Sequence, residues 1–104
     1  MDLVKLHEAA DKASKLLKVL SNRDRLILLC QMTKGEISVS ELEATTSIQQ
    51  PTLSQQLTVL RMEQLVNTRR EGKQIFYGIA SNEALAVMQL LYQLYCPKEQ
   101  EARQ

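Results

Sequence analysis

Residues 49–61 (QQPTLSQQLTVLR) constrain the fold more strongly than any other stretch of the chain. Leu53, Leu57 and Leu60 recur at the i, i+4, i+7 spacing of one buried helical face. Around this stripe lie Thr, Ser and Gln side chains, where an ordinary surface helix would carry Lys and Glu. Pro51 suits a first helical turn, because its missing N–H leaves no hydrogen bond unmade there. The stretch therefore predicts a helix with one apolar face and one uncharged polar face.

The uncharged polar face suits the base edges of a DNA major groove, because Gln can pair with adenine and Ser or Thr with several bases. Upstream, a capping box at residues 38–41 opens a shorter apolar-patterned segment that extends to about Thr45. Helix, short turn and polar-faced helix form a helix-turn-helix. The alternative is a solvated helix in some other bundle. If the helix binds DNA, the candidate DNA-contacting residues are Gln50, Thr52, Ser54, Gln55, Gln56, Thr58 and Arg61.

Apolar spacing predicts two further helices ahead of this pair. The first is amphipathic and covers residues 3–20, with lysines on its polar side. Residues 21–24 then resemble a capping box with Ser21 as the N-cap, and the second helix stops at residues 34–35, a lysine followed by a glycine. The residues of the second helix that we expect to point inward are Leu26, Ile27, Leu29, Cys30 and Met32.

The periodicity changes after the fourth helix, which we expect to end near Glu63. Residues 66–70 and 74–79 contain β-branched and aromatic residues, and residues 71–73 (EGK) lie between them, which predicts a β-hairpin with a glycine turn. A hairpin directly after a polar-faced helix makes a winged helix-turn-helix. The wing carries the expected DNA-binding residues Arg69, Arg70 and Lys73, which could reach the DNA backbone or minor groove. The alternative is a solvated turn.

A final helix is expected from Asn82 to about Cys96, and it is apolar on more than one face. A terminal helix of this kind needs a second partner surface. The predicted fold is therefore mainly α with a small β-hairpin, a winged helix-turn-helix in the order α-α-α-α-β-β-α. Residues 1–97 form one domain with dimerisation helices at both ends, and residues 98–104 form a frayed tail. Such a homodimer would hold two recognition helices about one DNA turn apart.

Composition narrows the function further. A net charge of +1 over 104 residues means that any DNA affinity depends on local charge and on dimerisation. There is no apolar run of membrane-spanning length and no signal peptide, so we expect a cytoplasmic protein whose two cysteines rest as thiols. The three glycines are isolated, the only histidine is His7, and there is no CxxC motif. We therefore expect no enzyme activity, no cofactor and no membrane association.

Over roughly residues 14–96 the chain resembles the ArsR/SmtB family of winged-helix repressors. The segments that carry the resemblance are residues 16–29, 37–42, 53–61 and 69–73. The resemblance implies a homodimeric repressor that binds a pseudo-palindromic operator in double-stranded DNA. One departure is Gln56, where the family often has His; because Gln56 flanks the leucine stripe, this difference could affect packing more than base contact.

The family mostly senses metals, but metal ligands are sparse in this chain. Family members that bind metal at the third helix have thiolates where this chain has Ser38 and Ser40. Members that use the last helix have His and acidic ligands, and here that helix offers only Glu83. A soft-metal site needs several converging Cys or His ligands. We therefore expect no metal site, although a metal-responsive repressor remains one alternative and a winged-helix module that binds another protein remains a second.

The remaining candidates are Cys30 and Cys96, at the expected ends of the second and last helices. Their flanking sequences, residues 28–32 and 94–97, resemble the branch of the family, the BigR, SqrR and HlyU group, that responds to sulfide-derived persulfides and oxidants. This resemblance implies that a disulfide or a short polysulfide chain links the two cysteines and lowers operator affinity. The alternative is that Cys30 is simply a small buried apolar residue. Which oxidant acts, and whether the protein represses directly or displaces another silencing protein, stay open.

Overall fold

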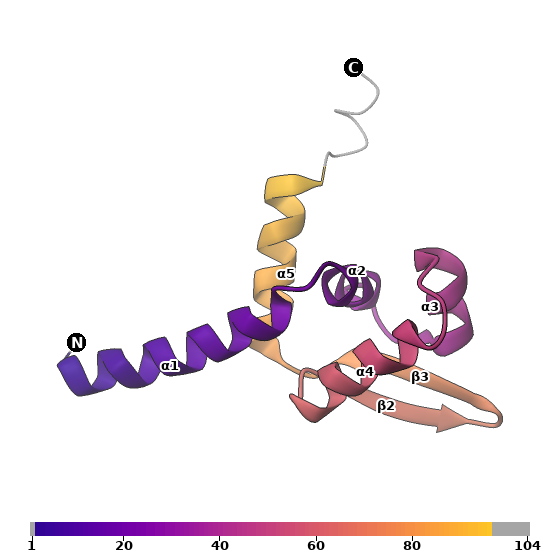
Figure 1. The fold of residues 1–104 in the computed structure, drawn as a ribbon, viewed down its shortest axis with the longest axis horizontal. Helices are drawn as coiled ribbons and strands as arrows, with labels where there is room; N and C mark the ends of the chain where they lie inside the picture. Colours follow the sequence, from indigo (N-terminus) through magenta and orange to yellow (C-terminus); the bar gives the residue numbers. More distant parts are fainter. Residues whose placement is uncertain (1, 97–104) are drawn as a thin grey trace, which may run out of the picture.

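The computed structural model describes residues 2–96, which form five helices and a three-stranded sheet. Figure 1 shows how these elements are arranged. The winged helix-turn-helix predicted from the sequence is confirmed, with one short strand added after the second helix. The elements are α1 (Leu3–Leu20), α2 (Arg23–Met32), β1 (Ile37–Ser38), α3 (Val39–Thr46), α4 (Thr52–Met62), β2 (Val66–Glu71), β3 (Gln74–Ile79) and α5 (Asn82–Tyr95).

The sheet is antiparallel, with strand order β1-β3-β2. In the hairpin, Val66 pairs with Ile79 at one end and Glu71 with Gln74 at the other, so only Gly72 and Lys73 form the turn. Gly72 has φ of +62°, a conformation that glycine adopts without steric cost. The additional strand β1 pairs with the edge of β3 that faces away from β2. It was not predicted because two residues are too few to show an alternating pattern.

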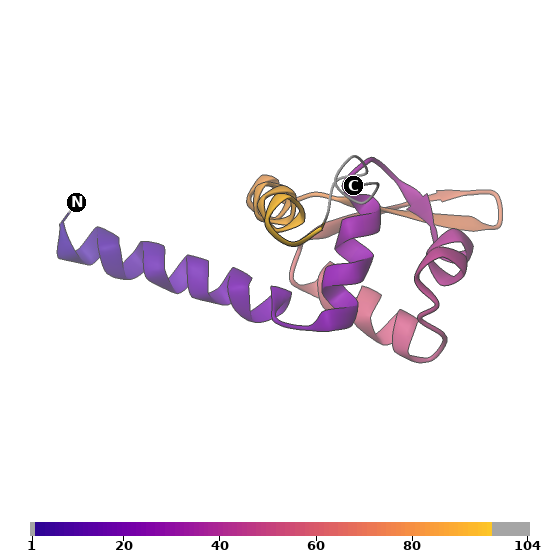
Figure 2. The same cartoon turned by 90° about the horizontal axis from the view of Figure 1, so that it is seen from above.

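Helix α2 lies at the centre of the fold, in contact with α1, α3, α4, α5 and β3 (Figure 2). Leu28 and Leu29 are fully buried, as is nearly all of Met32. The prediction left Leu28 out and placed Leu26 and Ile27 inward, yet these two are only partly buried. The physical reason is that a helix surrounded on several sides buries residues all round, so a single-stripe interpretation of its spacing fails.

The predicted cap of α2 is wrong by one residue. Ser21 ends α1 instead, because its N–H donates to the carbonyl of Lys18. Asn22 therefore becomes the N-cap, with its Oδ1 accepting from the N–H of Arg25 at 3.0 Å. The second predicted capping box is confirmed at its N-cap, since Ser38 Oγ accepts from the N–H of Glu41 at 3.2 Å.

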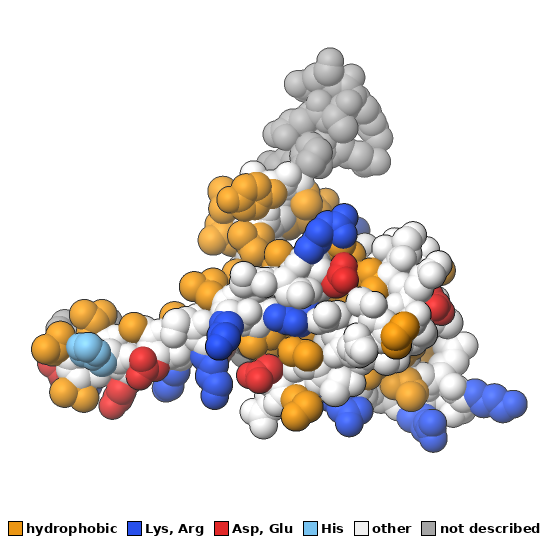
Figure 3. All heavy atoms as spheres, in the orientation of Figure 1, with side chains coloured by type: hydrophobic (Ala, Val, Ile, Leu, Met, Phe, Trp, Pro, Cys, Tyr) orange, Lys and Arg blue, Asp and Glu red, His pale blue; other side chains and the backbone are white. Residues whose placement is uncertain are grey.

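Helices α1 and α5 extend away from the rest of the molecule (Figure 1). The radius of gyration is 15.5 Å, against about 13 Å for a compact domain of this length. The apolar stripe of α1, which the sequence predicted to belong to a dimerisation helix, is buried only at its C-terminal end, at Val19 and Leu20. Along α5, Ala84 and Met88 are buried while the second half is exposed, and apolar atoms cover this part of the surface in Figure 3. Both terminal helices therefore present apolar faces that one chain does not cover.

Two further predictions concern the chain's end and its relation to a membrane. The frayed tail predicted for residues 98–104 lies outside the described residues. Within residues 2–96, no helix combines the length and the hydrophobicity needed to cross a bilayer.

Candidate nucleic-acid interface

Helix α4 buries its leucine stripe and exposes its polar side. Leu53, Leu57 and Leu60 are almost completely buried. At about 100° per residue, Gln55 lies opposite this stripe, with Ser54 on one flank of the helix. Gln55 is exposed, and no intramolecular hydrogen bond of its side chain is present within the described chain. Its amide is therefore free to pair with a base edge.

Several other polar side chains of α4 already bond within the helix. Pro51 directly precedes α4 as its N-cap rather than lying in its first turn as predicted, and it has no side-chain acceptor. Gln50 supplies one instead, because its Oε1 accepts from the backbone N–H of Ser54 at 3.0 Å and from Ser54 Oγ at 2.6 Å. Thr58 donates its hydroxyl to the carbonyl of Ser54 at 2.8 Å. Gln50, Ser54 and Thr58 could thus bind DNA only through the donors and acceptors that these bonds leave free.

Gln56 lies on the opposite flank of α4 from Ser54 and is half-buried against α2. Its Oε1 accepts from Arg25 Nη1 at 2.9 Å. Besides the packing role that the sequence suggested, Gln56 therefore makes a specific hydrogen bond. Of the remaining predicted residues, Thr52 is half-buried at the start of α4, and Arg61 is exposed in its last turn.

The wing residue Arg69 is engaged within the protein. Its Nε donates to Glu36 at 3.0 Å and its Nη1 to Glu71 at 2.8 Å. Its guanidinium also lies over the Phe76 ring, 4.7 Å from the centroid. Hydrogen bonds to Glu71 and then to Glu36 raise the pKa of Arg69 above its usual value. The sequence suggested Glu71 as the only counter-charge at the wing, but the fold brings Glu36 to the same arginine.

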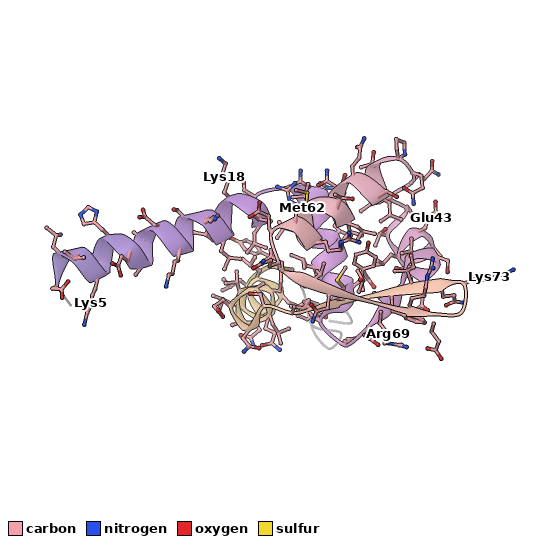
Figure 4. All side chains as sticks on the ribbon, turned by 90° about the horizontal axis from the view of Figure 1, so that it is seen from below. Lys5, Lys18, Glu43, Met62, Arg69 and Lys73 are labelled. Atoms are coloured by element: carbon pink, nitrogen blue, oxygen red, sulfur yellow. The ribbon has the colours of Figure 1, made fainter. Side chains whose placement is uncertain are left out.

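Arg70 projects from the other face of the sheet, because successive strand residues alternate between faces. Its cross-strand partner is Ile75, and Ile75 lines the groove beside α4. In Figure 4, Arg69 lies on the side of the hairpin away from α4, and Lys73 lies at the tip of the wing. Arg70 and Lys73 are both exposed. The strand register thus directs Arg70 toward the α4 side, and Lys73 also lines the groove there.

A groove separates α4 from the wing, with α3 at its end. Its polar lining consists mainly of Ser38, Ser40, Glu43, Ser54, Thr58 and Lys73. An exposed polar helix beside a basic hairpin provides amide and hydroxyl groups for base edges and cations for phosphates. Of the residues that the sequence suggested for DNA contact, Ser54, Thr58 and Lys73 line this groove, whereas Gln56 and Arg69 are bonded to neighbours outside it.

The two cysteines lie on elements that pack together, since α2 contacts α5. Both are free thiols; Cys30 is partly buried near the end of α2, and Cys96 is exposed directly after α5. Burial raises the pKa of the Cys30 thiol, negative charge on Cys96 raises it further, and Lys34 lowers it. Arg25, a second cation close to Cys30 in the sequence, bonds to Val19 and Gln56 instead.

Sequence reasoning missed two residues of this surface, Arg25 and Glu36. Each contacts a residue more than thirty positions away, Gln56 and Arg69 respectively. No local pattern marks such a pair, because each residue taken alone is an ordinary charged residue in a helix turn or a loop. Among the described residues, no three His, Cys, Asp or Glu side chains are grouped as metal ligands would be.

Comparison with known proteins decides the family. The sequence model of a family described as "Bacterial regulatory protein, arsR family" matches residues 22–68. A biofilm growth-associated repressor from Agrobacterium fabrum is 47% identical over 95 residues, which cover 91% of this chain and 81% of that protein. The chain belongs to the ArsR family. The resemblance seen in the sequence is thereby confirmed.

Two further relatives support the assignment of this ArsR-family protein. The transcriptional activator HlyU of Vibrio cholerae is 41% identical over 96% of this chain and 93% of its own length. The structure of reduced HlyU matches with a TM-score of 0.87, covering 91% of this chain and all of that one. A homodimeric winged helix-turn-helix DNA-binding domain from Mycobacterium bovis, a possible ArsR-family regulator, matches with a TM-score of 0.72 at 28% identity, covering 90% of this chain and 86% of that one. The ArsR-family chain is a DNA-binding transcriptional regulator of the winged-helix type, and its relatives are regulators rather than enzymes.

Proposed function

We propose that the protein is a homodimeric repressor that binds a pseudo-palindromic operator in the cytoplasm. Gln55, Thr52 and Ser54 of α4 read bases, and Arg70 and Lys73 of the wing contact phosphates. The observation that carries the proposal is the exposed polar face of α4, with the unpaired amide of Gln55 opposite the buried leucine stripe. An exposed face of short neutral side chains contributes little to folding, but it matches the base edges of a major groove.

The proposed dimer forms through α1 and α5. Four large apolar side chains of α5 are exposed, namely Leu90, Tyr92, Leu94 and Tyr95, and α1 exposes Leu3, Val4, Leu6 and Leu17. Soluble monomers rarely leave so many apolar side chains together on their surface. The Mycobacterium bovis relative is itself homodimeric. A two-fold dimer would hold the two α4 helices roughly 34 Å apart, so that they enter successive major grooves on one side of the duplex.

Selection of duplexes from a random pool by the wild-type protein tests the DNA proposal. We expect enrichment of an inverted repeat with half-sites about one helical turn apart, bound by two protomers. Enrichment of a single half-site bound by one protomer would contradict the dimeric arrangement. Failure to enrich any duplex would leave the winged-helix protein-interaction module as the better hypothesis. The enriched sequence, called the selected duplex below, serves as the probe in the experiments that follow.

We further propose that linkage of Cys30 to Cys96 lowers operator affinity. Two thiols joined as a disulfide lose two protons and two electrons to an oxidant. With an inorganic polysulfide as the oxidant, sulfur atoms are retained between the two Sγ atoms, and the electrons and protons leave with hydrogen sulfide. A direct disulfide needs Cα atoms within about 7 Å, whereas retained sulfur relaxes that limit. Support comes from the packing of α2 on α5 and from the electrostatic influence of Cys96 on Cys30.

The bridge would act through the helices that it joins. It ties α2, which contacts α4, to the C-terminal end of α5, which is a proposed dimer helix. A shift of α5 changes the dimer angle and therefore the separation of the two α4 helices. Contacts at both half-sites are then lost together, as a two-state redox switch requires. Among the relatives, HlyU has been described in a reduced form.

Single Cys30→Ser and Cys96→Ser variants test the switch on the selected duplex. Each should bind DNA as wild type does when reduced, and each should lose the response to polysulfide, because a bridge needs both ends. Treated wild type should run as a monomer on a non-reducing gel, and its intact mass should show a loss of two hydrogens or a gain of sulfur. If the Cys96→Ser protein still released DNA, or if the linkage joined two subunits, the switch would be wrong while the DNA-binding proposal could stand.

A further inference from the structure

Arg25 joins α1 to α4 through one guanidinium group. Its Nε donates to the carbonyl of Val19 at 2.6 Å, and its Nη1 donates to Oε1 of Gln56 at 2.9 Å. Arg25 is half-buried in the first turn of α2, and its own backbone N–H is held by the N-cap Asn22. Two of its guanidinium nitrogens, Nε and Nη1, therefore have partners on two different helices.

The bond to Val19 explains why the guanidinium is fixed. Val19 lies in the last turn of α1, where carbonyl groups lack an intrahelical partner. Val19 is also buried, so water does not readily replace the missing donor. A cation beside the C-terminal end of a helix is additionally favoured by the helix dipole. Arg25 thus satisfies the end of α1, and this contact leaves Nη1 in a defined place beside α4.

The bond to Gln56 determines which atoms of that side chain face outward. Arginine can only donate hydrogen bonds, so the amide atom of Gln56 that meets Nη1 must be the oxygen. The NH₂ group of Gln56 consequently points away from Arg25. A free glutamine can pair with adenine through both its oxygen and its NH₂ group. With the oxygen turned toward Arg25, Gln56 presents its two N–H donors on the other side, and these suit a phosphate oxygen or the O6 and N7 atoms of guanine.

We infer that Arg25 is a positioning residue that presents Gln56 to DNA as a hydrogen-bond donor. The inference rests on the proposed function, because it takes α4 to be the DNA-reading helix. Two neighbouring glutamines then differ in what they present: Gln55 has a free amide with both a donor and an acceptor, and Gln56 presents its donors because its oxygen is turned toward Arg25. The partner of Gln56 is therefore an acceptor group on DNA, and the two-bond pairing with adenine that a free glutamine makes is disfavoured.

A double-mutant cycle on the selected duplex tests whether Arg25 acts through Gln56. Arg25→Met and Gln56→Met should each weaken binding by roughly 5–20-fold, in the range of one lost hydrogen-bonded contact. The double variant should be no more than about twofold weaker than Gln56→Met alone, because the donor is already gone. Arg23→Met is the matched control, since Arg23 lies two residues away with a side chain that is 86% exposed. We expect it to bind within about twofold of wild type.

The melting temperature of each variant without DNA separates positioning from folding. Gln56→Met should leave the melting temperature unchanged within error, and Arg25→Met should lower it because the Val19 carbonyl loses its donor. Additive losses of affinity in the cycle would overturn the inference, since Arg25 would then act through the fold and not through Gln56. If Arg25→Met does not fold, Gln56→Met decides alone, and unchanged affinity for the selected duplex would overturn the inference. A wild-type protein that enriches no duplex would instead count against the proposed function.

Discussion

The molecule has two exposed surfaces of opposite chemistry. One is the face of α4 and the wing, where side chains are polar and several hydrogen bonds are already made within the helix. The other comprises α1 and the second half of α5, where leucine and tyrosine side chains are exposed (Figure 3). Neither surface is covered by the described chain, but the two require partners of different chemistry. Apolar groups gain free energy by any close-packed burial, whereas amides and hydroxyls gain only where specific donors and acceptors meet them.

This difference sets the expected sensitivity of each surface to substitution. A charge placed on the apolar surface must lose its hydration if the dimer is to form, which is costly. Loss of one polar group on α4 removes one hydrogen-bonded base contact and leaves the neighbouring contacts in place. We therefore expect large effects on assembly from α5, intermediate effects on sequence recognition from α4, and the smallest effects from single cations of the wing.

The largest effect is expected from Leu90→Glu. Leu90 is 52% exposed on α5, so burial of its exposed part contributes about 0.8–1.5 kcal/mol for each copy, half of the value for a whole side chain. Because a two-fold dimer contains the position twice and each introduced carboxylate must also lose its hydration, we expect the dimer dissociation constant to rise by roughly 150-fold or more. Analytical ultracentrifugation measures this directly. Binding to the selected duplex should weaken in parallel, because a monomer contacts one half-site only.

Met62→Glu is the matched control for this substitution. Met62 is more exposed than Leu90, at 76%, but it ends α4 and lies outside both terminal helices. We expect the Met62→Glu protein to remain dimeric at the concentrations where Leu90→Glu dissociates. Equal dissociation of both variants, or of neither, would mean that α5 does not carry the dimer interface.

An intermediate effect is expected from Gln55→Ala. Gln55 is exposed opposite the leucine stripe, so its loss should leave the melting temperature unchanged. On the selected duplex we expect a loss of about 1–3 kcal/mol for each half-site, which is roughly 5–150-fold in affinity per half-site. On a scrambled duplex of the same length the affinity should change little, because non-specific binding depends on phosphates. Fluorescence anisotropy with both duplexes provides the comparison, and equal losses on the two would remove Gln55 from base recognition.

The parts of this architecture that sequence could predict are those determined by neighbouring residues. The leucine stripe of α4, the Ser38 cap and the glycine turn of the wing each follow from a spacing of a few positions. The cap of α2 was misplaced by one residue because Ser21 and Asn22 are both good N-caps. The choice between them depends on where α1 ends. The end of α1 is held by a tertiary contact, the bond from Arg25 to the Val19 carbonyl, which the local sequence does not reveal.

Long-range contacts account for most of what could not be predicted. The pairing of β1 with β3 and the bonds of Arg69 to Glu36 and Arg25 to Gln56 join segments that are far apart in the chain. An apolar stripe in the sequence also does not identify the surface that will cover it. The face of α1 was correctly recognised as apolar and this chain leaves most of it exposed, while its role in a dimer stays a prediction.

The smallest effect is expected from the wing, where two adjacent arginines should behave differently. Arg70 is exposed on the α4 side of the sheet, while Arg69 is held by Glu36 and Glu71 over Phe76. A phosphate contact releases counterions, so each one lost should flatten the slope of log affinity against log salt by about 0.9. Arg70→Ala should therefore reduce the slope by about 1.8 for a dimer that loses one contact per protomer.

Arg69→Ala provides the comparison within the same strand. Because both acidic partners of Arg69 already neutralise its guanidinium, its removal should change the slope by clearly less than that of Arg70 does. Titrations of both variants against the selected duplex at several salt concentrations measure the two slopes. Equal reductions would show that DNA recruits Arg69 away from Glu36 and Glu71, and that the ion pairs of the free protein are exchanged for phosphates on binding. An unchanged slope for both, and for Lys73→Ala as well, would leave the wing without a role in binding DNA.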